Sequence, residues 1–188
     1  MSESANPTTG PTVVIRRAAD ADAEAMQEIF NQEVVGSTAS WEWFPLSNDD
    51  WRAWFHEHTK EHHVLLVAEV DHAVAGFAGY GEFRAKQGYV STVEDSVFLR
   101  EGYRGMGLGT RLLSALMDQA RARSVHAMVA AVTSENEASI RLHEACGFRQ
   151  VGYLPQVGHK FGRWLDLVLL QATLDEDPIP GRCARSVD

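Results

Sequence analysis

The chain of 188 residues suits one domain of ordinary size with its own hydrophobic core. Its 45% hydrophobic and 23% charged residues are typical of a soluble globular protein, and no apolar run approaches the roughly 20 residues that span a bilayer. Lys and Arg number 17 against 26 Asp and Glu, and the formal charge of −9 argues against a general nucleic-acid binder, which must neutralise phosphates. The first residues lack the basic and apolar regions of a secretory signal, so we expect a cytoplasmic protein with neither a membrane nor a nucleic-acid partner.

Both ends of the chain are rich in small and polar residues and contain proline. We expect residues 1–11 to form a disordered N-terminal tail and residues 175–188 a flexible C-terminal tail, which leaves residues 12–174 as a single folded domain. Cys146 and Cys183 do not have the spacing of a metal site, so both are expected to be free thiols, with Cys146 as a small residue of the core.

Hydrophobic periodicity and turn residues predict a series of strands and helices. Their order, β-α-α-β-β-β-α-β-α-β-β, predicts a mixed α/β domain around one sheet. In chain order, the expected elements are a strand over 12–18, a helix over 19–35 with Asp20 or Asp22 as its N-cap, a helix over 47–62, two strands within 63–83 joined at Asp71 and His72, a strand over 88–100, a helix from 108, a strand over 126–134, a helix over 136–146 capped by Asn136, and strands over 148–154 and 162–174.

The segment "LREGYRGMGLGTRLL" (99–113) places four glycines within eight residues, directly before a predicted helix. A strand, a glycine turn and a helix start together form an anion site, because the first N–H groups of the helix lack partners and its dipole favours negative charge. The segment has no lysine, unlike a P-loop, and its spacing Gly105-x-Gly107-x-Gly109 does not fit the Rossmann pattern. A plain strand-to-helix turn without a ligand is the alternative.

Within this segment, "YRGMGLGTRLL" resembles the R/Q-x-x-G-x-G/A pyrophosphate loop of the GNAT superfamily of N-acetyltransferases, with Arg104, Gly107 and Gly109 at the signature positions. Downstream, "NEASIRLHEACGF" is similar to the N-x-x-S/A-x-x-L-[YH]-E-x-x-G-F helix of the same fold. "VEDSVFL" and "GHKFGRWLDLVLLQATL" resemble the phosphinothricin (methionine sulfoximine) acetyltransferase branch, over about residues 13–174. The resemblance implies a mostly antiparallel sheet that splays at the coenzyme site and is flanked by helices.

The same resemblance implies acetyl-CoA as co-substrate, with its diphosphate on the loop amides and its pantetheine arm along the end of the preceding strand. Asn136 and Ser139 would contact the pantetheine or nucleotide part. The implied coenzyme-binding residues are Val97, Phe98, Leu99, Arg104, Gly105, Met106, Gly107, Leu108, Gly109, Thr110, Asn136 and Ser139.

Acetyl transfer to an amine requires a base for the substrate ammonium and an acid for the departing sulfur. Glu94 is the expected base, because a carboxylate within an apolar strand is costly unless it is partnered or functional, and the resembled branch has its catalytic glutamate there. Strand alternation places Asp95 on the opposite face. His143 stands where many GNAT enzymes have a tyrosine, and it is expected either to shuttle a proton or to pack against a backbone carbonyl.

The resembled branch acetylates the α-amino group of small amino-acid analogues with a compact anionic, sulfoximine or sulfone head, and it forms homodimers. Such a head requires cationic and aromatic walls, for which Arg84 is the first candidate. The candidate substrate-binding residues are Arg84, Lys86, Tyr89 and Lys160. The segment "SWEWF" (40–44) is expected either to form a lid or wall over the pocket or to pack under a loop.

The segment "HEHTKEHH" (56–63) carries His58 and His62 at helical spacing, but without a third ligand it is expected to be a polar helix face, and no metal is expected. Two other functions remain open at this stage. One is the same chemistry on a different amine, such as a peptide N-terminus, a polyamine or an antibiotic. The other is a non-catalytic sensor that binds acyl-CoA.

Overall fold

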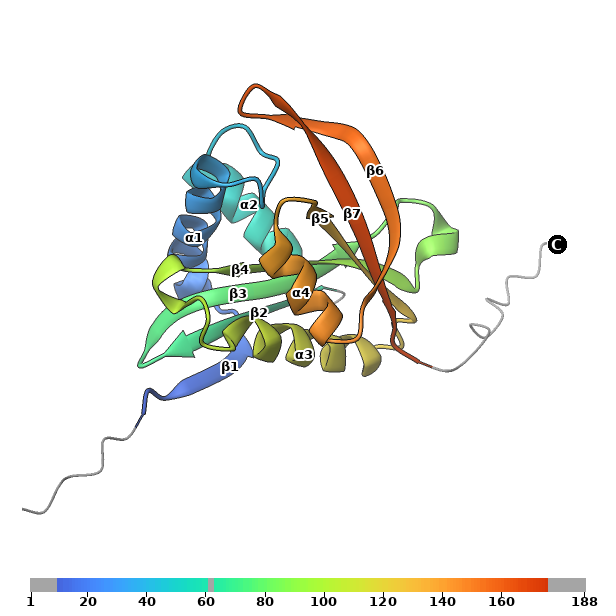
Figure 1. Ribbon diagram of the computed structural model, residues 1–188. Coiled ribbons are helices and arrows are strands. Elements are labelled where there is room, and N and C mark those ends of the chain that lie inside the picture. Colours follow the sequence, from blue (N-terminus) through green and yellow to red (C-terminus); the bar gives the residue numbers. More distant parts are fainter. Residues whose placement is uncertain (1–9, 61–62, 176–188) are drawn as a thin grey trace, which may run out of the picture.

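The computed structural model describes residues 10–60 and 63–175, so most of both predicted tails, together with Cys183 and His62, lies outside the described residues. The described chain forms one seven-stranded sheet with helices on both faces (Figure 1). The strands are β1 (Val13–Arg17), β2 (Val64–Val70), β3 (Ala73–Glu82), β4 (Thr92–Leu99), β5 (Ala127–Thr133), β6 (Arg149–Lys160) and β7 (Arg163–Thr173). The helices are α1 (Ala23–Gly36), α2 (Asn48–His58), α3 (Leu108–Arg121) and α4 (Glu137–Ala145).

The strand order in the sheet is β1-β2-β3-β4-β5-β7-β6. Each neighbouring pair is antiparallel except β4 and β5, which run parallel. The predicted order of helices and strands and the predicted mixed α/β fold are therefore confirmed. The β6–β7 hairpin leans away from the rest of the sheet (Figure 1).

The central strands of the sheet are buried on both faces, and β2 shows how the sequence achieves this. Leu65 and Val67 pack with α1 and α2, whereas the alternating Val64 and Leu66 pack in the larger cluster that contains the apolar side of α3. This explains why the predicted strand over 63–70 is a continuous apolar run rather than an alternating one. The larger cluster draws from α3 the residues Leu112, Leu113, Leu116, Met117 and Ala120.

Two tight turns fix the hairpins. Asp71 and His72 join β2 to β3 with φ of 46° and 68°, as two-residue hairpin loops require. Phe161 and Gly162 do the same between β6 and β7, with φ of 50° and 73°. The strand predicted to end at residue 154 is β6, and this predicted end is wrong. β6 continues through a register shift between Leu154 and Gly158 and ends at Lys160.

Two other predicted boundaries are also wrong. The second helix ends at His58 instead of residue 62. The N–H of Thr59, directly after this end, still donates to the Phe55 carbonyl. The strand expected from residue 88 begins at Thr92, because Gln87–Tyr89 forms a short 3-10 turn. Both errors arise where residue type alone gives little information about the end of an element.

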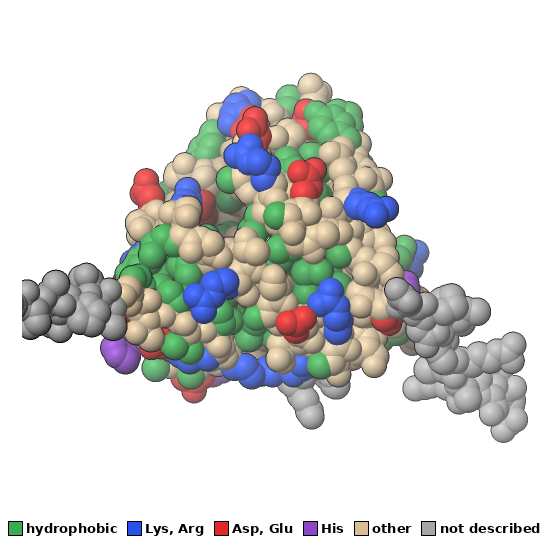
Figure 2. All heavy atoms as spheres, turned by 60° about the horizontal axis from the view of Figure 1, so that its bottom comes forward, with side chains coloured by type: hydrophobic (Ala, Val, Ile, Leu, Met, Phe, Trp, Pro, Cys, Tyr) green, Lys and Arg blue, Asp and Glu red, His purple; other side chains and the backbone are tan. Residues whose placement is uncertain are grey.

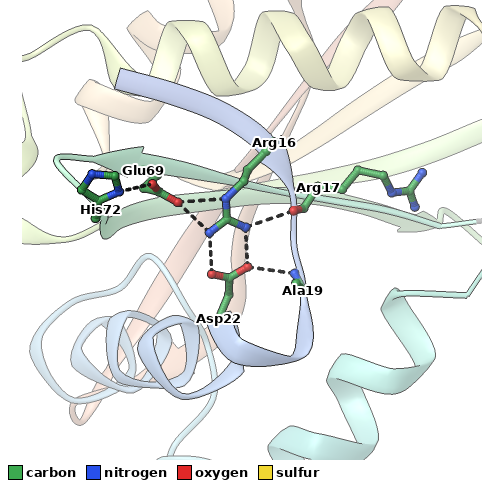
Figure 3. Close-up of polar contacts among 6 residues, drawn as sticks. All are labelled: Arg16, Arg17, Ala19, Asp22, Glu69 and His72. Atoms are coloured by element: carbon green, nitrogen blue, oxygen red, sulfur yellow. Dashed lines mark hydrogen bonds and ion pairs between the residues drawn. The ribbon is translucent and has the colours of Figure 1, made fainter. Parts of the chain in front are cut away.

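A charged network fastens β1, β2 and the start of α1 together (Figure 3). Arg16 donates to both carboxylate oxygens of Asp22, at 2.7 and 2.8 Å, and to Glu69 at 2.9 Å. Asp22, one of the two residues predicted as the N-cap of this helix, is the N-cap residue of α1. Its carboxylate does not cap the helix but accepts from Arg16 and from the N–H of Ala19. The hydrogen bond from Arg16 lowers the pKa of Asp22 against the opposing effect of burial.

Candidate active site

The sheet opens on one side of β4. Its pairing with β5 runs only from Thr92, opposite Ala127, to Asp95, opposite Ala130, although both strands continue. Beyond Asp95, the edge of β4 that faces β5 has no strand partner within the described ranges, while the other edge stays paired with β3 as far as Leu99. Free backbone groups on such an edge are suited to an extended ligand that carries amides.

A cavity of about 590 Å³ lies at this opening, between the end of β4, the glycine loop and α4. It includes every residue that the resemblance implies for the coenzyme except Met106, which is exposed. The predicted residues that line it are Val97, Phe98, Leu99, Arg104, Gly105, Gly107, Leu108, Gly109, Thr110, Asn136 and Ser139. Its volume is within the range of cofactor sites.

The glycine loop ends directly at the N-terminus of α3. Gly105 and Gly107 have φ of 79° and 74°, a region that strains residues with a side chain, and Gly107 is the residue before the helix. The first N–H groups of α3 therefore face the cavity end of the loop and can bind an anion. Arg104 forms an ion pair with Glu33 of α1, and Glu33 also accepts from the Ser37 hydroxyl at 2.6 Å. The N–H groups at the start of α3 and the Arg104 guanidinium fit a diphosphate, whereas the Glu33 carboxylate pairs with Arg104.

A second cavity, of about 640 Å³, lies beside α1, α2 and the loop between them. Glu94 and Arg84 line it, with the Arg84 guanidinium 4.0 Å from the Glu94 carboxylate. The cavity is also lined by Ser40, Trp41 and Glu42. The aromatic segment 40–44 therefore contributes a wall, which is one of the two alternatives expected for it. Lys160, which does not line the cavity, fixes this wall. Its buried ammonium group donates to the carbonyls of Ser37 at 2.9 Å and Ser40 at 2.5 Å.

A third cavity, of about 60 Å³, lies in the gap between β4 and β5. It shares Val97, Asn136 and Ser139 with the coenzyme cavity, Ser96 with the second cavity, and Ala39 and Phe98 with both. The two large cavities therefore meet at this gap, with β4 as their common wall.

Glu94 has the environment of a general base. Burial raises the pKa of its carboxyl group, the charge of Arg84 opposes that shift, and the charge of Asp95 adds to it. A carboxylate with a raised pKa is a stronger base, and this one faces the second cavity.

The His143 ring is held at both of its nitrogens. Nε2 lies 3.0 Å from Asp95 Oδ2, and Nδ1 lies 2.7 Å from the Ser139 carbonyl. Burial alone would lower the pKa of His143, but the hydrogen bond and charge of Asp95 outweigh it, so the pKa is raised. In this arrangement, no ring nitrogen is available to touch a substrate, which favours the expectation of a packed histidine over that of a direct proton donor.

The structure separates the four candidate substrate residues. Arg84 lines the second cavity, whereas Lys86, Tyr89 and Lys160 are not part of its lining. The aromatic lining from α1 and α2, namely Phe30 and Trp54, was not predicted from the sequence, because core packing and pocket lining give the same helical periodicity.

His58 also lines the second cavity, stacked on Trp54 with ring centroids 4.1 Å apart, so the expectation of a polar helix face is wrong for this residue. Burial lowers the pKa of His58. The described part of the chain contains no cluster of three metal-ligating residues. Cys146 is a free cysteine that packs at the edge of the larger cluster.

Figure 2 shows how the charged side chains are distributed on one face of the molecule. Basic and acidic side chains are scattered there among uncharged ones and do not gather into a basic patch. None of the described helices is long and apolar enough to cross a membrane.

An anion-binding loop beside an open strand edge, and a carboxylate beside a second cavity, define an enzyme that transfers a group from a bound coenzyme to another substrate. Residues 23–148 match the model of the Acetyltransferase (GNAT) family. The chain therefore belongs to the GNAT acetyltransferase family and is an N-acetyltransferase that uses acetyl-CoA.

Several relatives with a named activity are similar to this chain over most of its length. An L-methionine sulfoximine/L-methionine sulfone acetyltransferase of Salmonella typhimurium is 42% identical over 91% of this chain and 100% of its own length. An L-amino acid N-acyltransferase of Escherichia coli is 43% identical over 88% and 96%. A phosphinothricin N-acetyltransferase of Alcaligenes faecalis is 37% identical over 86% and 82%.

Solved structures agree with the fold. An acetyltransferase from Salmonella typhimurium with acetyl-CoA aligns with a TM-score of 0.87 and 42% identity, covering 91% of this chain and 99% of that one. A phosphinothricin acetyltransferase from Sinorhizobium meliloti, also in complex with acetyl-CoA, aligns with a TM-score of 0.84 and 34% identity, covering 88% and 90%.

Proposed function

We propose that the acceptor is the α-amino group of a small amino acid or analogue with a compact polar head, of the methionine sulfone, methionine sulfoximine or phosphinothricin type. The observation that carries this proposal is the placement of Arg84 beside Glu94 in a cavity with aromatic walls. A guanidinium binds a carboxylate or phosphinate of the substrate, while the adjacent carboxylate binds its ammonium group. The names of the relatives support the same substrate class.

In this proposal, Glu94 accepts a proton from the substrate ammonium, and the free amine attacks the acetyl carbonyl beside β4. Acetyl-CoA supplies the acetyl group when it is bound against Val97–Leu99, with its diphosphate on the loop that Gly105 and Gly107 shape. Binding both substrates on the two faces of one strand supplies the proximity that the reaction requires. Transfer is direct, without an acyl-enzyme.

We further propose that the enzyme is a cytoplasmic homodimer. Acetyl-CoA and amino acids meet in the cytoplasm. The support for a dimer is the edge strand β6, on which four apolar side chains are exposed. These side chains are Val151, Tyr153, Leu154 and Val157, which are 59%, 52%, 39% and 52% exposed.

The experiment is an acetylation panel. Purified protein is mixed with acetyl-CoA, a thiol reagent and single amines: L-methionine sulfone, L-methionine sulfoximine, phosphinothricin, a peptide, a polyamine and an aminoglycoside. We expect thiol release with the first three compounds. Release only with one of the other amines would replace the proposed substrate class, and binding of acetyl-CoA without release would indicate a sensor.

A further inference from the structure

His58 lines the second cavity from the end of α2, and its ring is held in one orientation. The ring stacks on Trp54 with centroids 4.1 Å apart and on His63 with centroids 5.3 Å apart. Its Nδ1 lies 2.8 Å from the Trp54 carbonyl, and because a carbonyl only accepts, Nδ1 carries the ring proton. Burial lowers the pKa of His58, so the ring is neutral near pH 7 and Nε2 has a free lone pair.

Gly81 of β3 leaves open space between this lone pair and Glu94. Nε2 of His58 lies 3.7 Å from the place that a Cβ of Gly81 would occupy, and among the described residues beyond the two chain neighbours no other atom comes within 4 Å of that place. Gly81 pairs with Glu94 across β3 and β4, and both line the second cavity. Directly opposed residues have their Cβ positions on one face, roughly 5 Å apart. The space above Gly81 therefore separates the Glu94 carboxylate from His58 by about the length of a small side chain.

The proposed function determines what enters this space, and the present inference rests on it. The ammonium group of the acceptor binds Glu94 and its carboxylate binds Arg84, so its side chain extends over Gly81 and its head group meets Nε2 of His58. A head group with an N–H or O–H donates to the lone pair. A head group with acceptor oxygens alone leaves Nε2 without a hydrogen bond and places one lone pair against another.

We propose that His58 is a specificity-determining residue of the acceptor site, which accepts a hydrogen bond from the head group and favours acceptors whose head carries an N–H or O–H. Methionine sulfoximine has such an N–H on its sulfur, where the sulfone has a second oxygen of nearly the same size. Phosphinothricin has an anionic phosphinate, which has no donor. The expected order therefore places the sulfoximine ahead of the other two compounds.

The first experiment compares kcat/KM for the sulfoximine and the sulfone. In wild type we expect a ratio of about ten in favour of the sulfoximine, the size of one hydrogen bond. His58→Phe keeps an aromatic ring on Trp54 but removes both nitrogens, so its ratio should fall close to one. His56→Phe, at an exposed position of the same helix, is the matched control and should keep the wild-type ratio. A wild-type ratio near one would overturn the inference, and so would a loss in His58→Phe that is equal for both acceptors.

A second variant tests where the head group lies without altering His58. Gly81 does not have a positive φ, so Gly81→Ala introduces a methyl group without backbone strain. This methyl group occupies the space above the strand, and we expect the KM for both acceptors to rise several-fold while the KM for acetyl-CoA stays the same. An unchanged acceptor KM would mean that the head group lies elsewhere, and the inference would fail.

A binding measurement separates this inference from the proposed function. Nitrogen-15 NMR of the histidine rings reports whether a ring nitrogen carries a proton or accepts a hydrogen bond, and His58→Phe identifies the signals of His58. In the free protein Nε2 should be unprotonated, and adding the sulfoximine, but not the sulfone, should shift its signal. If wild type acetylates neither compound, the proposed function fails, while the Nε2 signal still decides about His58. A shift with the sulfoximine alone supports the inference, whereas no shift, an equal shift with both compounds or a protonated Nε2 in the free protein contradicts it.

Discussion

Glu94 and Asp95 are neighbours on β4, yet the sheet gives them opposite surroundings. Glu94 faces the second cavity with Arg84 beside it, and Asp95 faces α4 and pairs with His143. This alternation follows from the period of a strand, so the sequence alone separated the two side chains correctly. It could not show that the Asp95 side chain is buried against a histidine 48 residues away, because that contact depends on how α4 packs on the sheet.

Replacing Glu94 by Gln should lower kcat by about 10²- to 10⁴-fold, the usual contribution of a general base, with little change in acetyl-CoA binding. Burial raises the pKa of Glu94, so in wild type kcat/KM should fall as the pH drops through a value above that of an ordinary glutamate. The variant should lack this acid limb. Stopped-time thiol assays across pH test both statements, and a variant with the wild-type profile would remove Glu94 from the role of base.

At the scale of elements, the loop between α1 and α2 illustrates what the sequence could not give. Its aromatic residues were compatible with either a wall or ordinary packing. Contacts with β6 decide that the segment forms a wall. Trp43 donates to the His159 carbonyl at 3.1 Å, and the ring of Trp41 packs on Gly158, where an added Cβ would clash with it. Such contacts join segments more than 100 residues apart, and no local pattern encodes them.

Lys160 holds this wall and should act on the acceptor site without touching the substrate. Lys160→Met leaves the carbonyls of Ser37 and Ser40 without their charged donor, which costs about 2 kcal/mol of folding stability. We expect the KM for the acceptor to rise several-fold and kcat to change less. Steady-state kinetics and urea unfolding measure the two effects, with exposed Lys60→Met as the matched control. An unchanged acceptor KM would mean that the wall does not depend on Lys160.

The network at the start of α1 gives a prediction about pH. The pKa of Asp22 is lowered in the folded protein, mainly by its hydrogen bond from Arg16, so the pair stabilises the fold above the unfolded pKa of about 3.9 and loses that effect as the pH falls through the lower folded value. Asp22→Asn should cost about 2 kcal/mol at pH 7. Denaturant unfolding should show that this difference shrinks in acid, whereas Asp20→Asn, at an exposed site, should change little at any pH.

For the whole molecule, the order of the elements was predictable because the helices have an apolar period and turn residues separate most elements, even where single boundaries were wrong. The opening between β4 and β5 was not predictable from periodicity. The two parallel strands stop pairing after Asp95 and Ala130, and only the resemblance to a known family pointed to this opening. The glycines of the loop were the only local pattern in the sequence that pointed to this region. Two of them take the left-handed conformation that the turn into α3 requires.

The last prediction concerns the edges of the sheet. β6 and β1 are the two edge strands, but only β6 exposes a row of apolar side chains, so a second copy should cover β6. Val151→Lys together with Val157→Glu places charges within that surface and should convert a dimer to a monomer in analytical ultracentrifugation. Val14→Lys, at the opposite edge, is the control and should stay a dimer. A stable interface buries about 800 Å² on each partner, enough for two charges at its centre to disrupt it. If wild type sediments as a monomer at micromolar concentration, the exposed row on β6 needs another explanation.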